Sequence, residues 1–293
     1  MTCRLLVLLI VASLGTAAQA QRPASAPVLV PVRLDIEGSF RIAPPYVADP
    51  AFIEKPSVPK GRVIRFTMNS AESRIFPTGP VGRGARPGGS GQPGQAPAEP
   101  PQHQTFERQV AVYVPAGYVA NTPAPFIIVQ DERWYIPEDA PAGQDGKPRS
   151  DLPFMPVMLD NLIHEKRIPP IVAVLLAPGP GGQRTIEYDT VSDRYVNFVE
   201  TEVLPRITRE HQVAFTTDPD GRATFGESSG AAAALTMAWL HPKLYRRVIS
   251  YSGTFVVVPP QTSEEYPHGA WAYHSTLIPN SPKKPIRIWM EVG

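Results

Sequence analysis

The sequence has only one cysteine, Cys3, among its 293 residues. Cys3 lies within residues 1–20, which we interpret below as a cleaved leader, so the mature chain is expected to hold no disulfide and no thiolate ligand for a metal. An excess of charge of one sign is also lacking, because the formal net charge is +1. Without a long-range field, neither nucleic acid nor an anionic membrane surface is indicated as a partner.

Long hydrophobic runs are missing as well, apart from a short one near the N-terminus. Residues 5–14 are mostly apolar, but a transmembrane helix needs roughly twenty such residues. Arg4 before this stretch and the small-x-small sequence that ends at Ala20 are typical of a signal peptide and its cleavage site. The sequence therefore predicts a signal peptide over residues 1–20, a periplasmic or secreted protein, and no stable membrane anchor.

Proline is the residue in excess, with 36 residues, and no Gly-X-Y repeat accompanies it, which excludes a collagen-like structure. We predict that residues 21–59 form a proline-rich segment that packs on the edge of a domain spanning residues 60–293. Within that domain, residues 77–102 consist mainly of Gly, Pro, Gln and Ala. Because they offer almost nothing to bury, they are expected to be a disordered insertion in a hairpin.

Strand and helix patterns alternate along the rest of the domain. Short runs rich in Ile and Val, at 126–130 and 171–176, are typical of strands covered on both faces of a parallel sheet. Further strands are expected at 62–68, 109–114, 222–225, 247–251 and 286–292, and helices at 157–163, from 192 onward with a kink at Pro205, and at 231–240. This order predicts an α/β fold with a mostly parallel central sheet and helices on both faces.

The segment Gly226-Glu227-Ser228-Ser229-Gly230 lies between a predicted strand and a predicted helix. A G-x-S-x-G sequence in that context is the pattern of a nucleophile elbow, in which the central serine projects from a strained turn above the sheet. The glycines on both sides let the strand and the helix approach each other without a Cβ clash. We therefore predict that Ser228 is a nucleophile; the alternative is an ordinary glycine-bounded turn in a doubly wound sheet.

An elbow of this kind also predicts an oxyanion hole. The amide of Ser229 lies at the start of the following helix, where free N–H groups point toward negative charge. A second donor is expected from the loop after the strand at 126–130, at Asp131 or Glu132.

Several segments together resemble one family. They occur in the same order as in that family and read RQVAVYVPAGY (108–118), FIIVQD (126–131), LDNLIHEKRIPP (159–170), RTIEY (184–188), FVETEVLP (198–205) and SYSG (250–253), besides the elbow. From about residue 61 to 293 the chain resembles the enterochelin-esterase-like esterases, which include feruloyl and acetyl-xylan esterases and esterase D. The resemblance implies an α/β-hydrolase fold, the same roles for Ser228 and Ser229, and a place near the site for Arg184, Glu187 and Tyr188.

The acid and the base of a catalytic triad are harder to find. In this fold they follow the serine in the order acid, then histidine, with the acid just after the strand predicted at 286–292. We therefore expect both beyond residue 293, in a domain that is incomplete at its C-terminal end. Among the histidines after the serine, His241 fits a helix C-terminus, and His268 and His274 lie in a long segment of the kind that builds lids.

We interpret the chain as an exported serine esterase that acts on a small ester, such as an acylated sugar or siderophore, without a cofactor or a metal. Trp134, Tyr135, Trp271 and Tyr273 occur in loops around the elbow and could stack on a sugar or aryl group, although ordinary packing explains them equally well. The alternative interpretation is a non-catalytic exported protein that binds carbohydrate or siderophore on the same fold. The sequence leaves the substrate open, because this fold serves many esters.

Overall fold

The computed structural model describes residues 38–39, 41, 47, 49–81, 102–136, 154–258 and 263–292. The chain divides into two units, Met1–Val47 and Ala48–Gly293, and every described helix and strand belongs to the second. The predicted signal peptide and most of the proline-rich segment lie outside the described residues. Where that segment is described, Asn161 holds it to a helix by donating side-chain hydrogen bonds of 2.8 Å to the carbonyls of Ala51 and Ile53.

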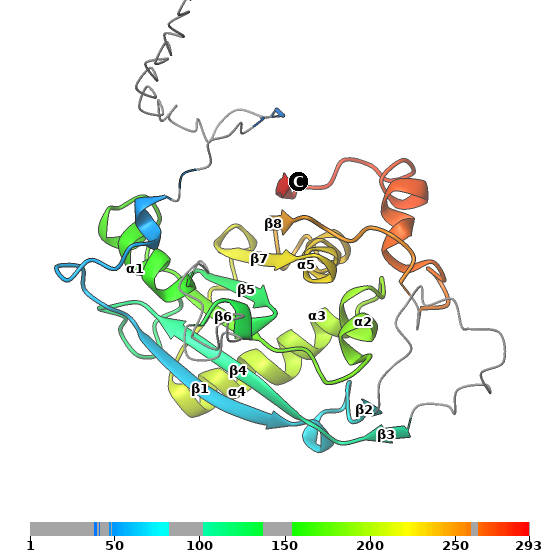
Figure 1. The fold of residues 1–293 in the computed structure, drawn as a ribbon, viewed down its shortest axis with the longest axis horizontal. Coiled ribbons are helices and arrows are strands. Elements are labelled where there is room, and N and C mark those ends of the chain that lie inside the picture. The colour runs from blue at the N-terminus through cyan, green and yellow to red at the C-terminus, as the bar shows by residue number, and fades with distance from the viewer. Residues whose placement is uncertain are drawn as a thin grey trace, which may run out of the picture. The chain divides into compact units, whose positions relative to one another are not determined.

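The second unit is built on a seven-stranded sheet with the strand order β1-β4-β6-β5-β7-β8-β9 (Figure 1). β4 pairs in the antiparallel sense with both β1 and β6, and all pairs from β6 to β9 are parallel. The strands are β1 (Arg62–Asn69), β4 (Glu107–Val114), β5 (Phe126–Gln130), β6 (Val172–Leu176), β7 (Arg222–Glu227), β8 (Arg247–Tyr251) and β9 (Arg287–Glu291). The sheet is thus mostly parallel, as the alternation of elements predicts.

Helices cover both faces of the sheet, so the α/β-hydrolase architecture predicted from the sequence is confirmed. Alternate residues of β4 show the two faces: Val110 and Val112 face one apolar layer, and Ala111 faces the other. The first layer includes α5 (Ser229–Leu240), whose Ala234 carbonyl accepts a hydrogen bond of 2.9 Å from Thr224 of β7. The second layer includes α1 (Met155–His164). β5 and β6 are buried at every position, because both faces are covered.

The helix predicted from residue 192 is divided by a π-helical turn. It consists of α3 (Arg194–Phe198), the π turn η4 (Val199–Val203) and α4 (Leu204–His211). Pro205 is in the first turn of α4, which follows η4 without a break. Its missing N–H therefore leaves one hydrogen bond of the continuous helix unmade. The irregularity expected at this proline therefore takes the form of a wider turn just before it, as π-bulges in helices commonly do.

The two ends of the insertion predicted at 77–102 pair with each other. They form a small antiparallel sheet of β2 (Gly79–Val81) and β3 (Gln102–Gln104), in which Gly79 pairs with Gln104. Backbone pairing needs few apolar side chains, so the composition of the segment did not indicate these two strands. The residues between these strands lie outside the described part of the chain.

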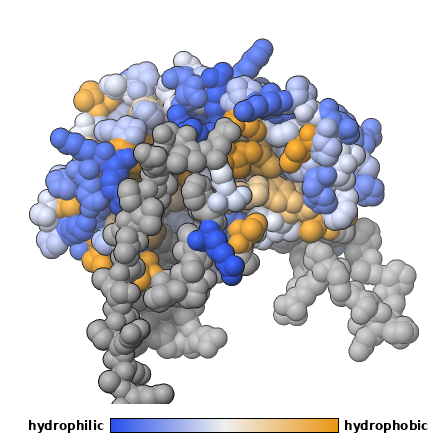
Figure 2. All heavy atoms as spheres, turned by 90° about the horizontal axis from the view of Figure 1, so that it is seen from above, coloured by the Kyte–Doolittle hydropathy of each residue, from blue (hydrophilic) through white to orange (hydrophobic). Residues whose placement is uncertain are grey.

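Large apolar side chains are exposed along β9, the last strand of the sheet. Ile288, Trp289 and Met290 have exposed fractions of 39%, 48% and 48%. The space-filling view from above likewise shows apolar surface gathered between polar regions (Figure 2). Among the described helices, none is long and apolar enough to cross a membrane.

Candidate active site

The turn that joins β7 to α5 has the geometry of a nucleophile elbow. β7 ends at Glu227, α5 begins at Ser229, and Ser228 between them has φ 56° and ψ −125°. Backbone in this part of conformational space is strained for a residue that carries a Cβ. Ser228 is exposed to solvent at this point, so its hydroxyl group is accessible at the carboxyl edge of the sheet.

Two glycines make this tight turn possible. A Cβ atom on Gly226 would lie 2.2 Å from the carbonyl carbon and oxygen of Gly230, which is too close for any side chain. A Cβ atom on Gly230 would lie 3.0 Å from Gln130 Cβ and 3.2 Å from a carboxylate oxygen of Asp131. The elbow is therefore packed against the end of β5 as well as against its own strand.

Thr254 ties the elbow to the segment that follows β8. Its hydroxyl group lies 2.9 Å from the hydroxyl oxygen of Ser228, and its amide donates to the Ser228 carbonyl at 3.1 Å. The Ser228 amide in turn donates to the carbonyl of Tyr251 at 3.0 Å. Sequence analysis missed Thr254, although its position just after a strand expected beside the elbow strand was a usable signal, because neighbouring parallel strands end at the same edge.

The start of α5 offers amide donors next to Ser228. The amides of Ala231 and Ala232 donate to the Ser228 carbonyl at 3.0 and 3.4 Å. The helix supplies no acceptor to the earlier amides of Ser229 and Gly230. This arrangement is compatible with the predicted role of the Ser229 amide as an oxyanion donor.

Of the two residues predicted as the second donor, Asp131 has its amide engaged elsewhere. Asp131 adopts a left-handed conformation with φ 61°, and its amide donates to the hydroxyl oxygen of Tyr188 at 3.3 Å. Glu132 is the first residue of the 3-10 turn η3 (Glu132–Trp134). Both residues directly follow β5, at the edge of the sheet where Ser228 also lies.

The side chain of Asp131 forms a forked ion pair with Arg184 on α2 (Gln183–Tyr188). The two hydrogen bonds measure 2.8 and 2.7 Å, and the guanidinium group also lies over the ring of Tyr188, 5.2 Å from its centroid. The side chain of Arg184 is 34% exposed. Arg184 is therefore fixed beside the elbow and still reachable from solvent, as a residue that contacts a substrate must be.

Glu187 and Tyr188, also predicted to contact a substrate, are buried. Glu187 forms a forked ion pair of 2.8 and 2.6 Å with Arg108 of β4, and the two side chains are 0% and 3% exposed. The hydroxyl group of Tyr188 lies 3.4 Å from the carbonyl of Leu176, and burial raises the pKa of Tyr188 well above its usual value. Neither residue is exposed for direct contact with a substrate, whereas Trp134 is half-buried.

Asp189, which follows α2, is a buried carboxylate that sequence analysis missed. It has an exposed fraction of 0%, and neither carboxylate oxygen has a hydrogen-bond partner among the described residues. Burial raises the pKa of Asp189 to about 6, although Ser229 and Arg184 act in the opposite direction. An ionisable group so placed next to an elbow is a candidate for a functional role.

No histidine is bonded to Ser228 among the described residues. Nε2 of His241 lies 3.2 Å from a carboxylate oxygen of Asp193, and Nε2 of His274 lies 3.1 Å from the carbonyl oxygen of Phe255. His268 precedes a short 3-10 turn. Within the same described ranges, no group of three or more potential ligands could hold a metal ion.

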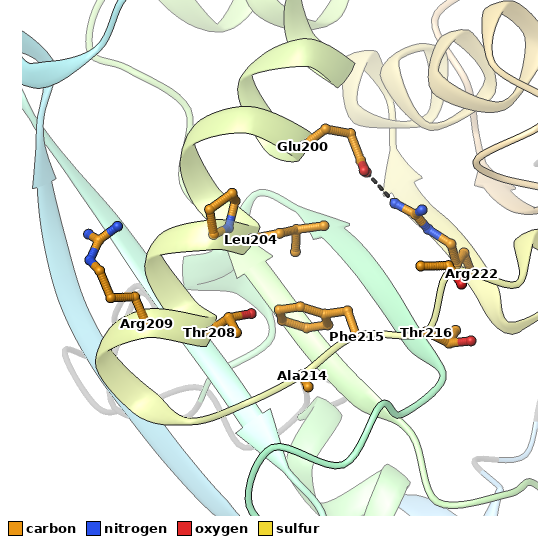
Figure 3. A pocket seen from close by; sticks show the side chains of 10 residues that line it. Glu200, Leu204, Thr208, Arg209, Ala214, Phe215, Thr216 and Arg222 are labelled. Atoms are coloured by element: carbon orange, nitrogen blue, oxygen red, sulfur yellow. Dashed lines mark hydrogen bonds and ion pairs between the residues drawn. The ribbon is translucent and has the colours of Figure 1, made fainter.

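A cavity of about 490 Å³ lies at the other end of β7 (Figure 3). Leu204 and Phe215 form its apolar part, and an ion pair between Glu200 and Arg222 closes one side. Arg222 is the first residue of β7, whereas Ser228 follows the last. This cavity is therefore separate from the elbow, and no serine or histidine lines it.

Comparison with known proteins places the chain beside esterases. The model of a family described as "Putative esterase" matches residues 104–293. Two structures of enterobactin esterase from Shigella flexneri, one of them in the presence of enterobactin, share 16% and 15% identity with the chain and a TM-score of 0.50. Each alignment covers 80% of the chain and 46% of the esterase.

A feruloyl esterase module from Clostridium thermocellum aligns over 86% of the chain and 72% of its own length, with 14% identity and a TM-score of 0.45. The chain thus spans less than half the length of the enterobactin esterases it matches. A search of curated proteins gave no match.

Proposed function

Because the chain belongs to the esterase family whose model matches residues 104–293, we propose that it hydrolyses a carboxylic ester through an acyl-enzyme on Ser228. One observation carries this proposal: the hydroxyl group of Ser228 is exposed on a strained turn between a parallel strand and a helix. Strain of this kind persists only where the surrounding structure enforces it, and it is concentrated at active sites.

In the proposed reaction, the Ser228 oxygen attacks the ester carbonyl carbon while a base takes the hydroxyl proton. The carbonyl oxygen becomes an oxyanion that accepts hydrogen bonds from the amide of Ser229 and from a second donor at Asp131 or Glu132, assisted by the positive end of the α5 dipole. The alcohol leaves with a proton from the base, and water then releases the acid from Ser228. The base in this mechanism is a histidine supported by a carboxylate.

The test compares Ser228→Ala with the wild type in the full-length protein, using p-nitrophenyl acetate. Removal of a catalytic serine is expected to lower kcat/KM by at least about 10³-fold. Ser275→Ala is the matched control, because Ser275 is an exposed serine that bonds only to the carbonyl of Trp271. Unchanged turnover in Ser228→Ala would refute the assignment.

A fluorophosphonate probe separates the esterase from the second candidate function. That candidate is a non-catalytic protein which binds carbohydrate or siderophore on the same fold, and it is favoured by the lack of a histidine bonded to Ser228 in the described part of the chain. An activated serine reacts quickly with the probe, so mass spectrometry should locate the label on Ser228. A protein that binds enterobactin or an acylated sugar but takes no label would support the binding function.

We also propose that the protein is exported and that its substrate is an acylated sugar or a siderophore ester. The first part rests on the signal-peptide pattern of residues 1–20. N-terminal sequencing of the protein recovered from the periplasm or the medium should give Gln21 as the first residue. A start at Met1 in the mature protein would contradict export by this route.

A further inference from the structure

Asp189 places a carboxyl group inside the protein without a partner. Its exposed fraction is 0%, and neither of its carboxylate oxygens has a hydrogen-bond partner among the described residues. Burying a charge in this way costs free energy, because the solvation of the charge is lost and nothing replaces it. Packing alone therefore does not explain a carboxylate at this position, where an amide or an apolar side chain would cost less.

The backbone of Asp189 is held from two sides. Its amide donates to the carbonyl of Thr185 at 2.9 Å, which ends α2, and its carbonyl accepts from the amide of Ala270 at 3.2 Å. These bonds come from different elements, so the position of the residue is well defined.

The carboxyl group lies beside the first residue of α5. Asp189 directly follows α2, which packs against α5, and Ser229 is the first residue of α5. Burial raises the pKa of Asp189, and the hydroxyl group of Ser229 acts against this effect. No hydrogen bond of normal geometry joins the two side chains in this structure. The other charged groups that act on the carboxyl are Arg184 of α2, which favours the ionised form, and Asp131 after β5, which disfavours it.

We propose that Asp189 is a positioning residue for the oxyanion hole: it accepts the hydroxyl hydrogen of Ser229 and so fixes the peptide whose N–H faces the substrate. The inference rests on the proposed function, which uses that N–H. Ser229 is only 6% exposed, so its hydroxyl group cannot turn to bulk water for an acceptor. The hydroxyl group and the amide of Ser229 belong to the same residue. A hydrogen bond that holds the hydroxyl group therefore restricts the orientation of the amide.

The experiment measures kcat and KM of the full-length protein with p-nitrophenyl acetate for Asp189→Ala, Asp189→Asn, Ser229→Ala and the double variant with both alanines. Complete loss of an oxyanion donor lowers kcat by about 10²–10³-fold. A donor that is present but misplaced should therefore lower kcat by about tenfold. Asp189→Ala should show that loss with KM changed less than about twofold. Asp189→Asn should retain most of kcat, because its amide oxygen still accepts the hydrogen bond.

The double variant tests whether the two residues act together. If Asp189 works through Ser229, kcat of the double variant should equal that of the lower single variant. If kcat of the double variant fell by the product of the two single losses, the proposal would be overturned. Equal losses of kcat in Asp189→Ala and Asp189→Asn, or an unchanged kcat in Asp189→Ala, would overturn it too. Asp193→Asn is the control, since Asp193 is a nearby carboxylate whose side chain is 61% exposed, and it should behave as wild type.

Ser228→Ala in the same series separates the two proposals. If that variant keeps wild-type turnover, the proposed function fails, and the contact between Asp189 and Ser229 is then judged from thermal unfolding of the same variants. Shifts of Tm that add in the double variant would overturn the contact as well. If Ser228→Ala is inactive and the Asp189 variants are not impaired, only the positioning role fails.

Discussion

Replacement of Asp189 by asparagine is expected to stabilise the folded protein at neutral and alkaline pH. Burial raises the pKa of Asp189 from 3.8 to about 6, so the folded state prefers the protonated, neutral form. Above pH 6 the folded protein must hold the charge, and this penalty disappears as the pH falls from 6 toward 3.8. Each unit of pKa shift corresponds to about 1.4 kcal/mol. The shift from 3.8 to about 6 therefore lowers the free energy of unfolding at pH 8 by about 3 kcal/mol.

Asparagine has nearly the same shape and no charge, so it should remove that penalty without leaving a cavity. For a domain of this size, 1 kcal/mol corresponds to roughly 2–4 °C in Tm. Differential scanning calorimetry between pH 3.5 and 8.5 should therefore show Asp189→Asn about 6–12 °C above wild type at pH 8, with the difference falling to about a third of that at pH 4.5 and disappearing below pH 3.8. A variant equal to or below wild type at pH 8, or a difference independent of pH, would refute the reasoning.

Three further variants test other parts of the site. Gly226→Ala should lower Tm by more than about 6 °C or prevent folding, because its Cβ would lie 2.2 Å from the Gly230 backbone; wild-type unfolding by circular dichroism would contradict this. Glu187→Gln should lower the free energy of unfolding in urea by about 3 kcal/mol, because it leaves the buried charge of Arg108 unpaired. KM of the folded enzyme should stay within about twofold of wild type. A large rise in KM would instead support direct contact between Glu187 and the substrate. Thr254→Val should slow fluorophosphonate labelling about fivefold, the equivalent of one hydrogen bond of about 1 kcal/mol, and an unchanged rate would show that Thr254 does not orient the nucleophile.

The parts of the fold that could be predicted from the sequence are those in which local pattern and tertiary environment agree. The apolar runs of β5 and β6 are buried at every position, as continuous Ile- and Val-rich segments indicate. The elbow is also largely local, because Gly226, Ser228 and Gly230 occupy five consecutive residues and the clash that Gly226 avoids is with the Gly230 backbone of the same turn. The paired ends of the insertion, β2 and β3, could not be recognised because backbone pairing leaves little trace in composition.

Roles that depend on distant partners were predicted less well. Glu187 occurs in a segment that resembles an esterase motif, but its role is set by Arg108, which lies 79 residues earlier in the chain. Asp189 had no sequence signal, since only burial and the neighbouring start of α5 distinguish it from a surface aspartate. Thr254 follows a recognised segment by one residue, and its contact with Ser228 depends on the parallel pairing of β7 with β8.

Features that raise the free energy of the folded state are distributed unevenly in this structure, and their location supports a functional interpretation. At the carboxyl edge of the sheet, the backbone conformation of Ser228 costs on the order of 1–3 kcal/mol, and the unpaired carboxylate of Asp189 lies beside the next residue. At the opposite end of β7, the half-buried carboxylate of Glu200 is instead paired with both Arg222 and Tyr245. Selection for stability alone would remove strain and unpaired charge from both ends equally. Strain at Ser228 and the unpaired carboxyl group of Asp189 coincide around the elbow, which argues that the conformation of Ser228 and a hydrogen-bond acceptor at Asp189 are retained for the reaction of an ester at this edge.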